Sequence, residues 1–361
     1  MFNILFVTHQ LGFNMYGGSE TQILKTLEYI NNAPNTQYRV KLFNMWEDNL
    51  EKYDIIHIFN PRHFPIEAYH LCRYAKNIGI NIVVSPVFYS HSMKKGKFLQ
   101  SWVEDTFIKS RKFCSEIKII SNLDPLKKMN SVLKFSDILL PNTQEELNLL
   151  TKHFSISNKK SYIVPNGVDI EFKQGNSVFF KENYGVDDFI LFVGRIEPRK
   201  NVLRLIKSFV KSGLDTKLVL IGSKVDFNYY ELCKKYSTDK VIFLSPLPHD
   251  SSLLKSAYKA AKVVVLPSDY ETPGLVALEG ALAGANIVIT KIGGTTEYFG
   301  EYARYVDPSS ESDICQALIE MYNTPKSNEL SMYIENNFTW NKVAEKTIHA
   351  YDTVTSSSRH K

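Results

Sequence analysis

The 361-residue sequence has no long apolar run and only four cysteines. No stretch approaches the roughly 20 consecutive apolar residues that a helix needs to cross a bilayer, so we predict no transmembrane segment. The cysteines (Cys72, Cys114, Cys233 and Cys315) are scattered without a C-x-x-C pair, which indicates neither a zinc knuckle nor a disulfide framework. Such usage favours a reducing compartment, and we expect the protein in the cytoplasm.

Several sequence signals are also missing. The first residues, MFNILFVTHQLG, carry no basic leader and no small-residue cleavage site, so we expect a first strand there and no signal peptide. The loop HQLGFNMYGGSE has no G-x-G-x-x-G motif, which disfavours a dinucleotide-dependent dehydrogenase. No low-complexity segment or short repeat is present, and only the tail SSSRHK is expected to be disordered.

Positive charge is unevenly distributed along the chain. Residues 1–165 hold 20 Lys and Arg against 14 Asp and Glu, a balance of +6, whereas residues 166–361 hold 23 against 24, a balance of −1. Residues 91–134 alone hold 10 basic and 4 acidic residues, which equals the whole surplus of the first half. The rest of the chain is not basic and has no base-reading motif, so we expect no nucleic-acid partner.

The basic segment 91–134 allows two interpretations. It is either a solvated helical face or a surface for an anionic partner, which would be a membrane leaflet or a phosphate-bearing substrate. Phe98, Trp102 and Phe107 are interleaved with its lysines. That pattern suits an interfacial helix and equally a helix face packed into the core.

Short apolar strands alternate with helix-period segments along the chain. Runs this apolar are typical of a parallel sheet covered by helices on both faces. The alternation predicts an α/β fold of two doubly wound halves, joined near residues 165–185. The predicted strands are 3–8, 54–59, 81–86, 136–142, 189–195, 217–223, 241–246, 261–268 and 285–290. Two helix ends are also predicted, an N-terminal capping box at Thr143 with Glu146 and a terminal glycine at Gly213.

Ligands of such sheets bind at the carboxyl ends of the strands, so the segment after strand 261–268 is informative. There, PSDYETPGLVALEGALAG predicts a helix start with Thr272 as N-cap and Pro273 as the first helical residue. At about 100° per residue from Leu275, Glu279 lies near +40°, at the border of the apolar stripe. A carboxylate in that position needs a partner, because an unpaired buried charge is costly.

Glu271 and Glu279 allow two interpretations. The free N–H groups at residues 273–276 form an anion site, and a diphosphate bound there would leave Glu279 near a ribose and Glu271 near a sugar. Alternatively, Glu279 is a salt-bridged helix residue and Glu271 is a solvated loop acid. The segment VGRIEPRKN follows a strand and brings Arg195 and Lys200 near a helix start, where basic groups suit a diphosphate.

In their order and spacing, these segments resemble the family-4 retaining glycosyltransferases of GT-B fold over nearly the whole chain. The segments that carry the resemblance are GGSE, VPNGVD, VGRIEPRKN, PSDYETPGLVALEGALAG, IGGTTEYF and FTWNKVAEKTIHAYD. The resemblance implies two Rossmann-like doubly wound parallel-sheet domains that face each other across a cleft. The N-terminal acceptor domain would be residues 1–168, joined by a final helix at about 339–355, and the nucleotide-sugar domain would be residues 169–338.

The resemblance also implies roles for the matching residues. The donor substrate would be a nucleotide diphosphate-sugar of UDP or GDP type, with no cofactor, and the lack of a D-x-D motif fits a reaction without a metal. Arg195 and Lys200 would neutralise the diphosphate. Glu271 would hydrogen-bond the donor sugar and Glu279 the ribose.

Backbone positions are implied in the same way. N–H groups around Gly274 and Leu275 would help hold the phosphate or sugar, and Gly17 and Gly18 would let the first loop approach donor and acceptor. The histidine that the family often places near the donor sugar has no clean match. His91 is the nearest catalytic candidate, and it is equally well a surface or structural residue.

Other positions separate this chain from the family. His9 is a weaker candidate for the same histidine, and His57, within a strand, is expected in the core. The family commonly has Phe, Ala and Pro where this chain has Pro273, Gly280 and Asn286. Pro273 leaves the preference for a donor sugar open.

The acceptor is not identified by these motifs. The N-terminal half of GT-B enzymes carries acceptor recognition, so we expect a glycan or lipid-linked saccharide used for surface polysaccharide or lipopolysaccharide. The protein would then lie at the inner face of the cytoplasmic membrane, with residues 91–134 against the anionic surface. Two alternatives are a catalytically silent GT-B subunit of a glycosylation complex and a sugar-nucleotide epimerase.

Overall fold

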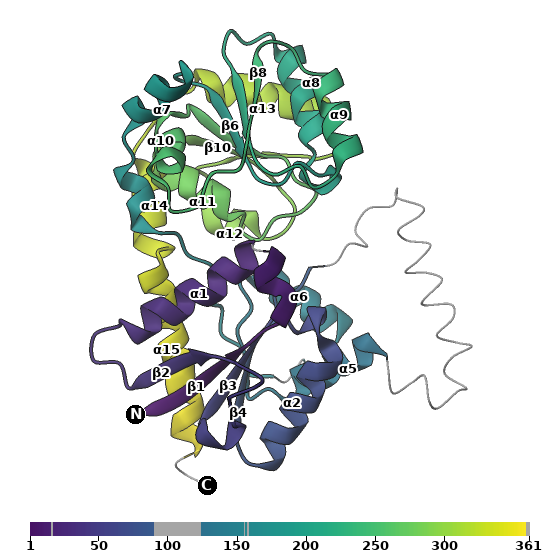
Figure 1. Cartoon of the computed structure of the whole chain (residues 1–361), viewed down its shortest axis with the longest axis vertical. Helices are drawn as coiled ribbons and strands as arrows, with labels where there is room; N and C mark the ends of the chain where they lie inside the picture. The colour runs from purple at the N-terminus through teal and green to yellow at the C-terminus, as the bar shows by residue number, and fades with distance from the viewer. Residues whose placement is uncertain (16, 90–123, 155, 157–158, 359–361) are drawn as a thin grey trace, which may run out of the picture. The chain divides into compact units, whose positions relative to one another are not determined.

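The chain forms two compact units, unit 1 (residues 1–165 and 344–361) and unit 2 (residues 166–343). The structure is a computed structural model that describes residues 1–15, 17–89, 124–154, 156 and 159–358 (Figure 1). The predicted histidine His91 and most of the basic segment 91–134 lie outside the described residues. Within the described residues, no helix is both long and apolar enough to cross a membrane.

Unit 1 is built on a five-stranded parallel sheet with the strand order β2-β1-β3-β4-β5. Its strands are β1 (Phe2–Val7), β2 (Tyr38–Leu42), β3 (Ile55–Phe59), β4 (Asn81–Ser85) and β5 (Ile138–Leu139). Its other elements are η1 (Gln10–Met15), α1 (Gly18–Asn31), η2 (Leu50–Lys52), η3 (Pro61–His63), α2 (Pro65–Asn77), α5 (Pro125–Phe135) and α6 (Gln144–His153). The strands predicted at 3–8, 54–59, 81–86 and 136–142 are confirmed, the last only as the short β5.

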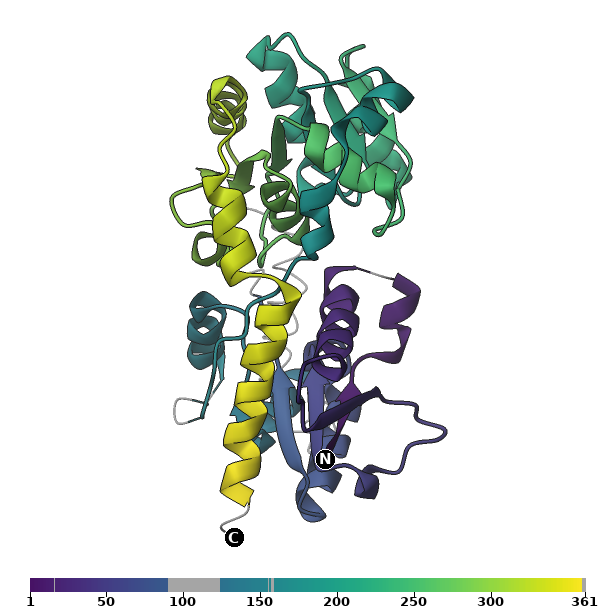
Figure 2. The same cartoon turned by 90° about the vertical axis from the view of Figure 1, so that its left-hand side faces the viewer.

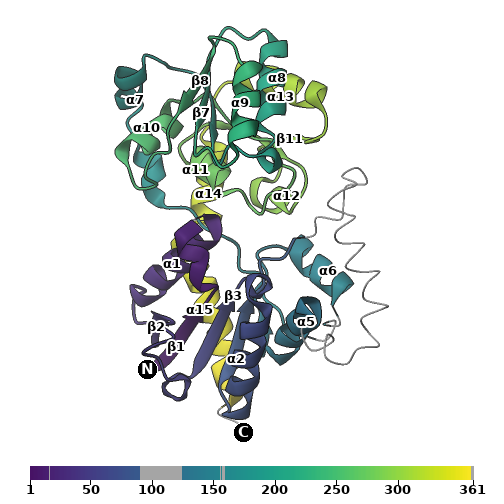
Figure 3. The ribbon, with the colours of Figure 1, turned by 45° about the vertical axis from the view of Figure 1, so that its right-hand side comes forward.

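Alternate residues of β1 and β3 enter two different apolar layers. Leu5 and Ile56 pack with the buried faces of α2 and α5, which lie side by side over the sheet (Figure 3). Phe6 and His57 point to the other face, where their rings pack edge to face with centroids 5.1 Å apart. Both faces are thus covered, as the apolar strands predicted.

Helix α15 (Trp340–Ser358) starts in unit 2 and ends in unit 1, where it lies along the sheet (Figure 2). Its Tyr351 hydroxyl lies 2.7 Å from Nδ1 of His57, and Nε2 of His57 lies 2.8 Å from the Ser85 hydroxyl. Burial lowers the pKa of His57 to about 3, so the ring is neutral. The expectation of a core histidine is confirmed.

Unit 2 is built on a six-stranded parallel sheet with the order β11-β10-β9-β6-β7-β8. The strands are β6 (Ile190–Val193), β7 (Leu218–Ile221), β8 (Val241–Leu244), β9 (Val263–Leu266), β10 (Asn286–Thr290) and β11 (Arg304–Val306). The other elements are η5 (Ile170–Gln174), α7 (Ser177–Tyr184), η6 (Pro198–Lys200), α8 (Val202–Ser212), α9 (Phe227–Lys235), α10 (Ser252–Ala260), α11 (Leu275–Leu282), α12 (Thr295–Phe299), α13 (Glu311–Asn323) and α14 (Glu329–Asn337). The five strands predicted in this half are confirmed.

Helix ends follow the local chemistry of the sequence. Thr143 caps α6 by accepting from the Glu146 N–H at 3.0 Å, and Gly213 ends α8 in the left-handed region with φ of 66°. Gly167, in the segment VPNGVD, lies against Trp340, and a Cβ at Gly167 would come within 2.8 Å of that ring. This position therefore needs glycine because of a close approach.

Candidate active site

The candidate site of unit 2 lies at the point where its strand order reverses. From β6 the chain continues to β7 and β8 on one side, and then returns to β9, β10 and β11 on the other. Ligands of open α/β sheets bind outside the carboxyl ends of the strands at such a point. The segments VGRIEPRKN and PSDYETPG follow β6 and β9, so both predicted motifs meet there.

Lys200, at the end of η6, and Glu271, after β9, form an ion pair at this edge. The Lys200 Nζ lies 2.5 Å from Oε1 of Glu271, and Glu271 is 8% exposed. Two backbone bonds support the pair, because the Asp269 N–H donates to the Arg199 carbonyl at 2.9 Å and the Glu271 N–H donates to the Ile292 carbonyl at 3.1 Å. Glu271 is therefore not the solvated loop acid of the alternative interpretation.

The ion pair decides the charge of Glu271. Burial alone would raise the pKa of this carboxyl, but the positive charges of Lys200 and Arg199 and the Lys200 hydrogen bond together hold the pKa below its ordinary value. The group is ionised at neutral pH and is poorly suited to donate a proton. It can instead accept hydrogen bonds from hydroxyl groups.

The predicted start of the next helix is wrong by two residues. Helix α11 begins at Leu275 with Gly274 as N-cap, and the Thr272–Pro273 peptide bond is cis. The Thr272 hydroxyl donates to the Gly293 carbonyl at 2.8 Å, and no side chain caps the start of α11. Gly274 takes the position at φ of 81°, which a residue with a Cβ rarely adopts.

With the corrected helix start, the free N–H groups of the predicted anion site belong to residues further along the chain. The first N–H groups of a helix have no partner within the helix and carry the positive end of its dipole. In α11 these groups belong to Leu275 and Val276, not to Pro273, which has no N–H. The predicted positions Gly274 and Leu275 therefore lie at the helix start, and Glu271 precedes the N-cap by three residues.

Glu279 lies one turn into α11 and is 4% exposed, as its position beside the apolar stripe predicted. Its Oε1 lies 2.8 Å from Nε2 of His249, and its Oε2 accepts from the Tyr258 hydroxyl at 2.5 Å. Burial, followed by the Glu279 charge, raises the pKa of Tyr258 well above its ordinary value, so this hydroxyl remains a donor. The predicted partner requirement is met by two residues that the sequence interpretation did not identify.

A signal for these partners is present in the sequence. Tyr258 lies on α10 and His249 lies in the loop before it, between two consecutive strands of the same sheet. A buried carboxylate on the following helix needs donors from adjacent elements. The pattern narrows the choice to polar residues near α10, but it does not reveal which of them reach Glu279.

Glycines bring the backbone of this site close together. A Cβ at Gly293 would lie 2.3 Å from the Glu271 carbonyl, and one at Gly280 would lie 2.6 Å from Cγ2 of Val264 on β9. Gly280, where the family commonly has Ala, thus allows α11 to pack closely against the sheet. Asn286, where the family commonly has Pro, donates from Nδ2 to the Met321 and Thr324 carbonyls, both at 2.9 Å.

The remaining predicted residues are distributed over both units. Arg195 follows β6 and is half-buried. Gly17 is the N-cap of α1 and Gly18 is its first residue, and the Gly17 N–H donates to Oε2 of Glu20 at 2.9 Å. His9 follows β1, where it packs near His63, with ring centroids 6.4 Å apart.

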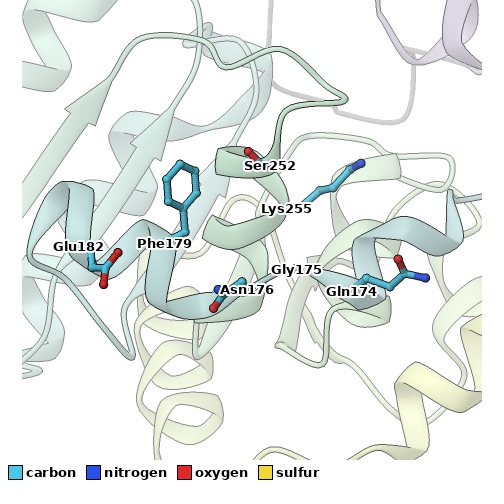
Figure 4. Close-up of a pocket in the computed structure, with 7 residues that line it drawn as sticks. All are labelled: Gln174, Gly175, Asn176, Phe179, Glu182, Ser252 and Lys255. Atoms are coloured by element: carbon cyan, nitrogen blue, oxygen red, sulfur yellow. The ribbon is translucent and has the colours of Figure 1, made fainter.

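A hollow of 380 Å³ lies elsewhere on unit 2 (Figure 4). It is lined from η5, α7 and α10, and Lys255 on its wall pairs with Glu171. The hollow includes none of the predicted site residues. The lining residues are Gln174, Gly175, Asn176, Phe179, Glu182, Ser252 and Lys255.

Known proteins are similar to this chain in part of the sequence and in fold. Residues 175–340 match the family model Glycosyl transferases group 1. An uncharacterized glycosyltransferase of Methanocaldococcus jannaschii is 31% identical over 220 residues, which are 55% of each chain. A D-inositol 3-phosphate glycosyltransferase of Kribbella flavida is 30% identical over 63% of this chain and 58% of the relative. The chain thus spans little more than half the length of these curated relatives.

Solved structures match over almost the whole chain at low identity. Sucrose-phosphate synthase from Thermosynechococcus elongatus has a TM-score of 0.74 at 15% identity and covers 99% of this chain and 100% of its own. The Anabaena protein HepE, solved with UDP and glucose, has a TM-score of 0.68 at 14% identity over 98% and 100%. The resemblance to group 1 glycosyltransferases and the predicted GT-B fold are confirmed, and the assignment to family 4 stays a prediction.

Proposed function

We propose that this protein is a retaining glycosyltransferase. It moves a sugar from a nucleotide diphosphate-sugar to a glycan acceptor, which we infer to be lipid-linked and used for surface polysaccharide or lipopolysaccharide. The observation that carries the proposal is the placement of Lys200, Glu271 and Glu279 around the start of α11 at the β6/β9 switch point. The named relatives and the UDP complex of a protein of the same fold support it.

The donor would bind along the start of α11. Its diphosphate meets the N–H groups of Leu275 and Val276 together with the Arg195 and Lys200 side chains, all of which favour negative charge. The Glu279 carboxylate, held by two donors, accepts from the ribose hydroxyls. Glu271 accepts from hydroxyls of the donor sugar, and Lys200 is then shared between Glu271 and the phosphate.

The reaction needs stabilisation of the departing diphosphate. The bond between the anomeric carbon and the phosphate oxygen breaks while the acceptor oxygen bonds to the same face of the sugar. The acceptor's proton passes to the leaving diphosphate, so no protein nucleophile is required. Preorganised cations and helix N–H groups lower the energy of this transition state because they need no reorganisation.

The experiment that tests the proposal is a donor screen by mass spectrometry. The purified chain is incubated with UDP-, GDP- and ADP-sugars, with and without soluble and lipid-linked saccharides. Transfer with an α-linked product from an α-linked donor supports the proposal. Absence of any transfer or hydrolysis supports a silent subunit, and a new sugar nucleotide formed without acceptor supports an epimerase.

The membrane location is a separate part of the proposal. We infer attachment to the inner face of the cytoplasmic membrane from the basic residues 91–134. Sedimentation with phosphatidylglycerol vesicles but not with phosphatidylcholine vesicles is the expected result. If the chain ignores anionic vesicles and glycosylates a soluble sugar, the lipid-linked acceptor is wrong and the transferase activity stands.

A further inference from the structure

The hollow formed by η5, α7 and α10 is a concave feature of unit 2 apart from the candidate active site (Figure 4). Its volume of 380 Å³ is at the lower end of the range of about 300–1,000 Å³ that is usual for small-molecule pockets. The buried Phe172 of η5 packs against His249 and Tyr258, with ring centroids 5.3 and 5.4 Å away. None of these three residues lines the hollow, so a ligand there does not take the place of a ligand at Glu279.

The walls of the hollow are joined to each other. A Cβ at Gly175, between η5 and α7, would lie 2.4 Å from the Lys255 carbonyl, so this turn lies directly against α10. The buried Ser256 hydroxyl of α10 accepts from the Phe180 N–H at 2.7 Å and donates to the Asn176 carbonyl. Close backbone packing and a buried hydroxyl thus fix the turn on the helix, and the hollow is preformed.

Two neighbouring phenylalanines of α7 have different surroundings. Phe180 is fully buried, and its ring centroid lies 4.7 Å from that of Tyr184 and 5.2 Å from that of Phe189. Phe179 is 40% exposed and lines the hollow, where Figure 4 shows its ring projecting from α7. An aromatic ring in this position offers a flat apolar surface to a ligand.

Polar side chains around the Phe179 ring have hydrogen-bonding groups to spare. Asn176 caps α7 through its Oδ1, which leaves the two Nδ2 donors for other partners. The other three polar side chains make no hydrogen bond to any residue that the structure describes, and they belong to Gln174, Glu182 and Ser252. The hollow therefore presents amide, carboxylate and hydroxyl groups beside one aromatic face.

The charges of the hollow do not favour an anion. The Lys255 ammonium is already paired with the Glu171 carboxylate. The other charged group on the wall is the Glu182 carboxylate, which would repel a phosphate or a second carboxylate. A neutral ligand with many hydroxyl groups fits these walls better than an anionic one.

We propose that this hollow binds a neutral saccharide, as a second sugar site apart from the candidate active site. The C–H face of a pyranose ring packs on Phe179, and the sugar hydroxyls exchange hydrogen bonds with the side chains of Gln174 and Glu182. The small volume suits a short saccharide. Use of the site to hold a sugar of the glycan acceptor rests on the proposed function, but the binding itself does not.

The proposal is tested by saturation-transfer difference NMR and calorimetry on the full chain without donor. The probes are the methyl glycosides of glucose, galactose, mannose, rhamnose and N-acetylglucosamine. We expect at least one of them to bind, and saturating UDP should leave its affinity unchanged because none of the Glu279 partners lines the hollow.

Variants locate the binding. Phe179→Ala should weaken the bound glycoside about tenfold, since it removes an aromatic contact together with its buried area. Gln174→Ala should weaken it severalfold through the loss of hydrogen bonds. Both side chains are exposed, so neither variant disturbs the core. The matched control is Phe227→Ala, a 68% exposed phenylalanine on α9, which should bind like the parent chain.

Two results would overturn the proposal. One is that none of the five glycosides binds, and the other is that binding is unchanged in both Phe179→Ala and Gln174→Ala. Sugar transfer is measured on the same samples. A chain that binds a glycoside in the hollow but transfers no sugar contradicts the proposed function and leaves this site in place. A chain that transfers sugar but binds glycosides equally in parent and both variants contradicts this site alone.

Discussion

The carboxyl edges of the two sheets share a topology but differ in how their charges are satisfied. In unit 2 both carboxylates have side-chain partners, Lys200 for Glu271 and His249 with Tyr258 for Glu279. In unit 1 the Arg62 guanidinium, after β3, donates to the backbone carbonyl of Tyr89 at 2.7 Å, and the Asn60 Oδ1 has no hydrogen-bond partner among the described residues. The carboxylates at the edge of unit 2 are thus held by side-chain donors, whereas the arginine at the edge of unit 1 is held by a backbone carbonyl.

The largest expected effect is a loss of turnover when the positive charge of Lys200 is removed from the edge of unit 2. Lys200→Ala should lower turnover by about 10²–10³, as for loss of one electrostatic donor to a developing charge. Lys200→Arg should retain more activity because the charge remains. Steady-state kinetics with a nucleotide sugar measure both variants, and Lys211→Ala on the exposed face of α8 is the control. Equal rates for Lys200→Ala and the parent would rule out the role.

A smaller effect is expected at Glu279, one turn into α11. Glu279→Ala should weaken nucleoside diphosphate binding about 10- to 100-fold, in line with roughly 1.5–3 kcal/mol for hydrogen bonds to a charged group. Calorimetry with UDP and GDP measures the dissociation constant, with the exposed Glu231→Ala on α9 as control. Normal affinity in Glu279→Ala would contradict a ribose contact and leave Glu279 a purely structural partner of His249 and Tyr258.

The next prediction concerns stability and the packing of α11 against β9. Gly280→Ala should lower the free energy of unfolding by about 1–3 kcal/mol, because the added methyl group meets Val264. Denaturant unfolding measures the loss. Val264→Ala makes room for that methyl group, so the double variant should lose less than the sum of the two single changes. Strict additivity would show that the close contact does not limit the fit of α11 on β9.

The last prediction concerns the pH dependence of the stability of unit 1. The pKa of His57 is about 3 in the fold, against an ordinary value of 6.5. Between these values the unfolded chain binds the proton and the folded chain does not, so stability is lost as pH falls from about 6.5 toward 3. This contribution has a slope of at most about 1.4 kcal/mol per pH unit.

His57→Gln should remove that slope. The readout is the difference between the unfolding free energies of parent and variant at several pH values, so that carboxylates common to both cancel. The difference should shrink as pH falls below about 6.5. A difference that stays constant with pH would show that His57 is not held neutral beneath α15.

The sequence predicted central elements better than marginal ones. All strands at the middle of both sheets were found from their apolar runs, whereas β2 and β11 were missed. Both lie at sheet edges, and β2 (YRVKL) alternates buried residues with the charged Arg39 and Lys41. Edge strands bury one side and tolerate charge, so they lack the continuous apolar signal of buried strands.

The candidate site was predicted only in part, because some of its contacts join residues that are distant in the sequence. Its main charges, Lys200, Glu271 and Glu279, follow from motifs in loops after strands and from helix geometry. The helix start at Thr272 was wrong because the local signal Thr-Pro competes with a tertiary bond from the Thr272 hydroxyl to the Gly293 carbonyl. No local pattern contains that bond, since its partner lies on the loop after β10.

By itself, the sequence determined the two doubly wound sheets, the position of the candidate site after β6 and β9, and the need of Glu279 for a partner. These properties depend on periodicity and on residues close in the chain. Only the tertiary structure decided that His249 and Tyr258 are the partners of Glu279, that Thr272 bonds to Gly293 and leaves Gly274 as N-cap of α11, and that His9 lies near His63. Such contacts join residues far apart in sequence, and they depend on how the sheets bring strand ends together.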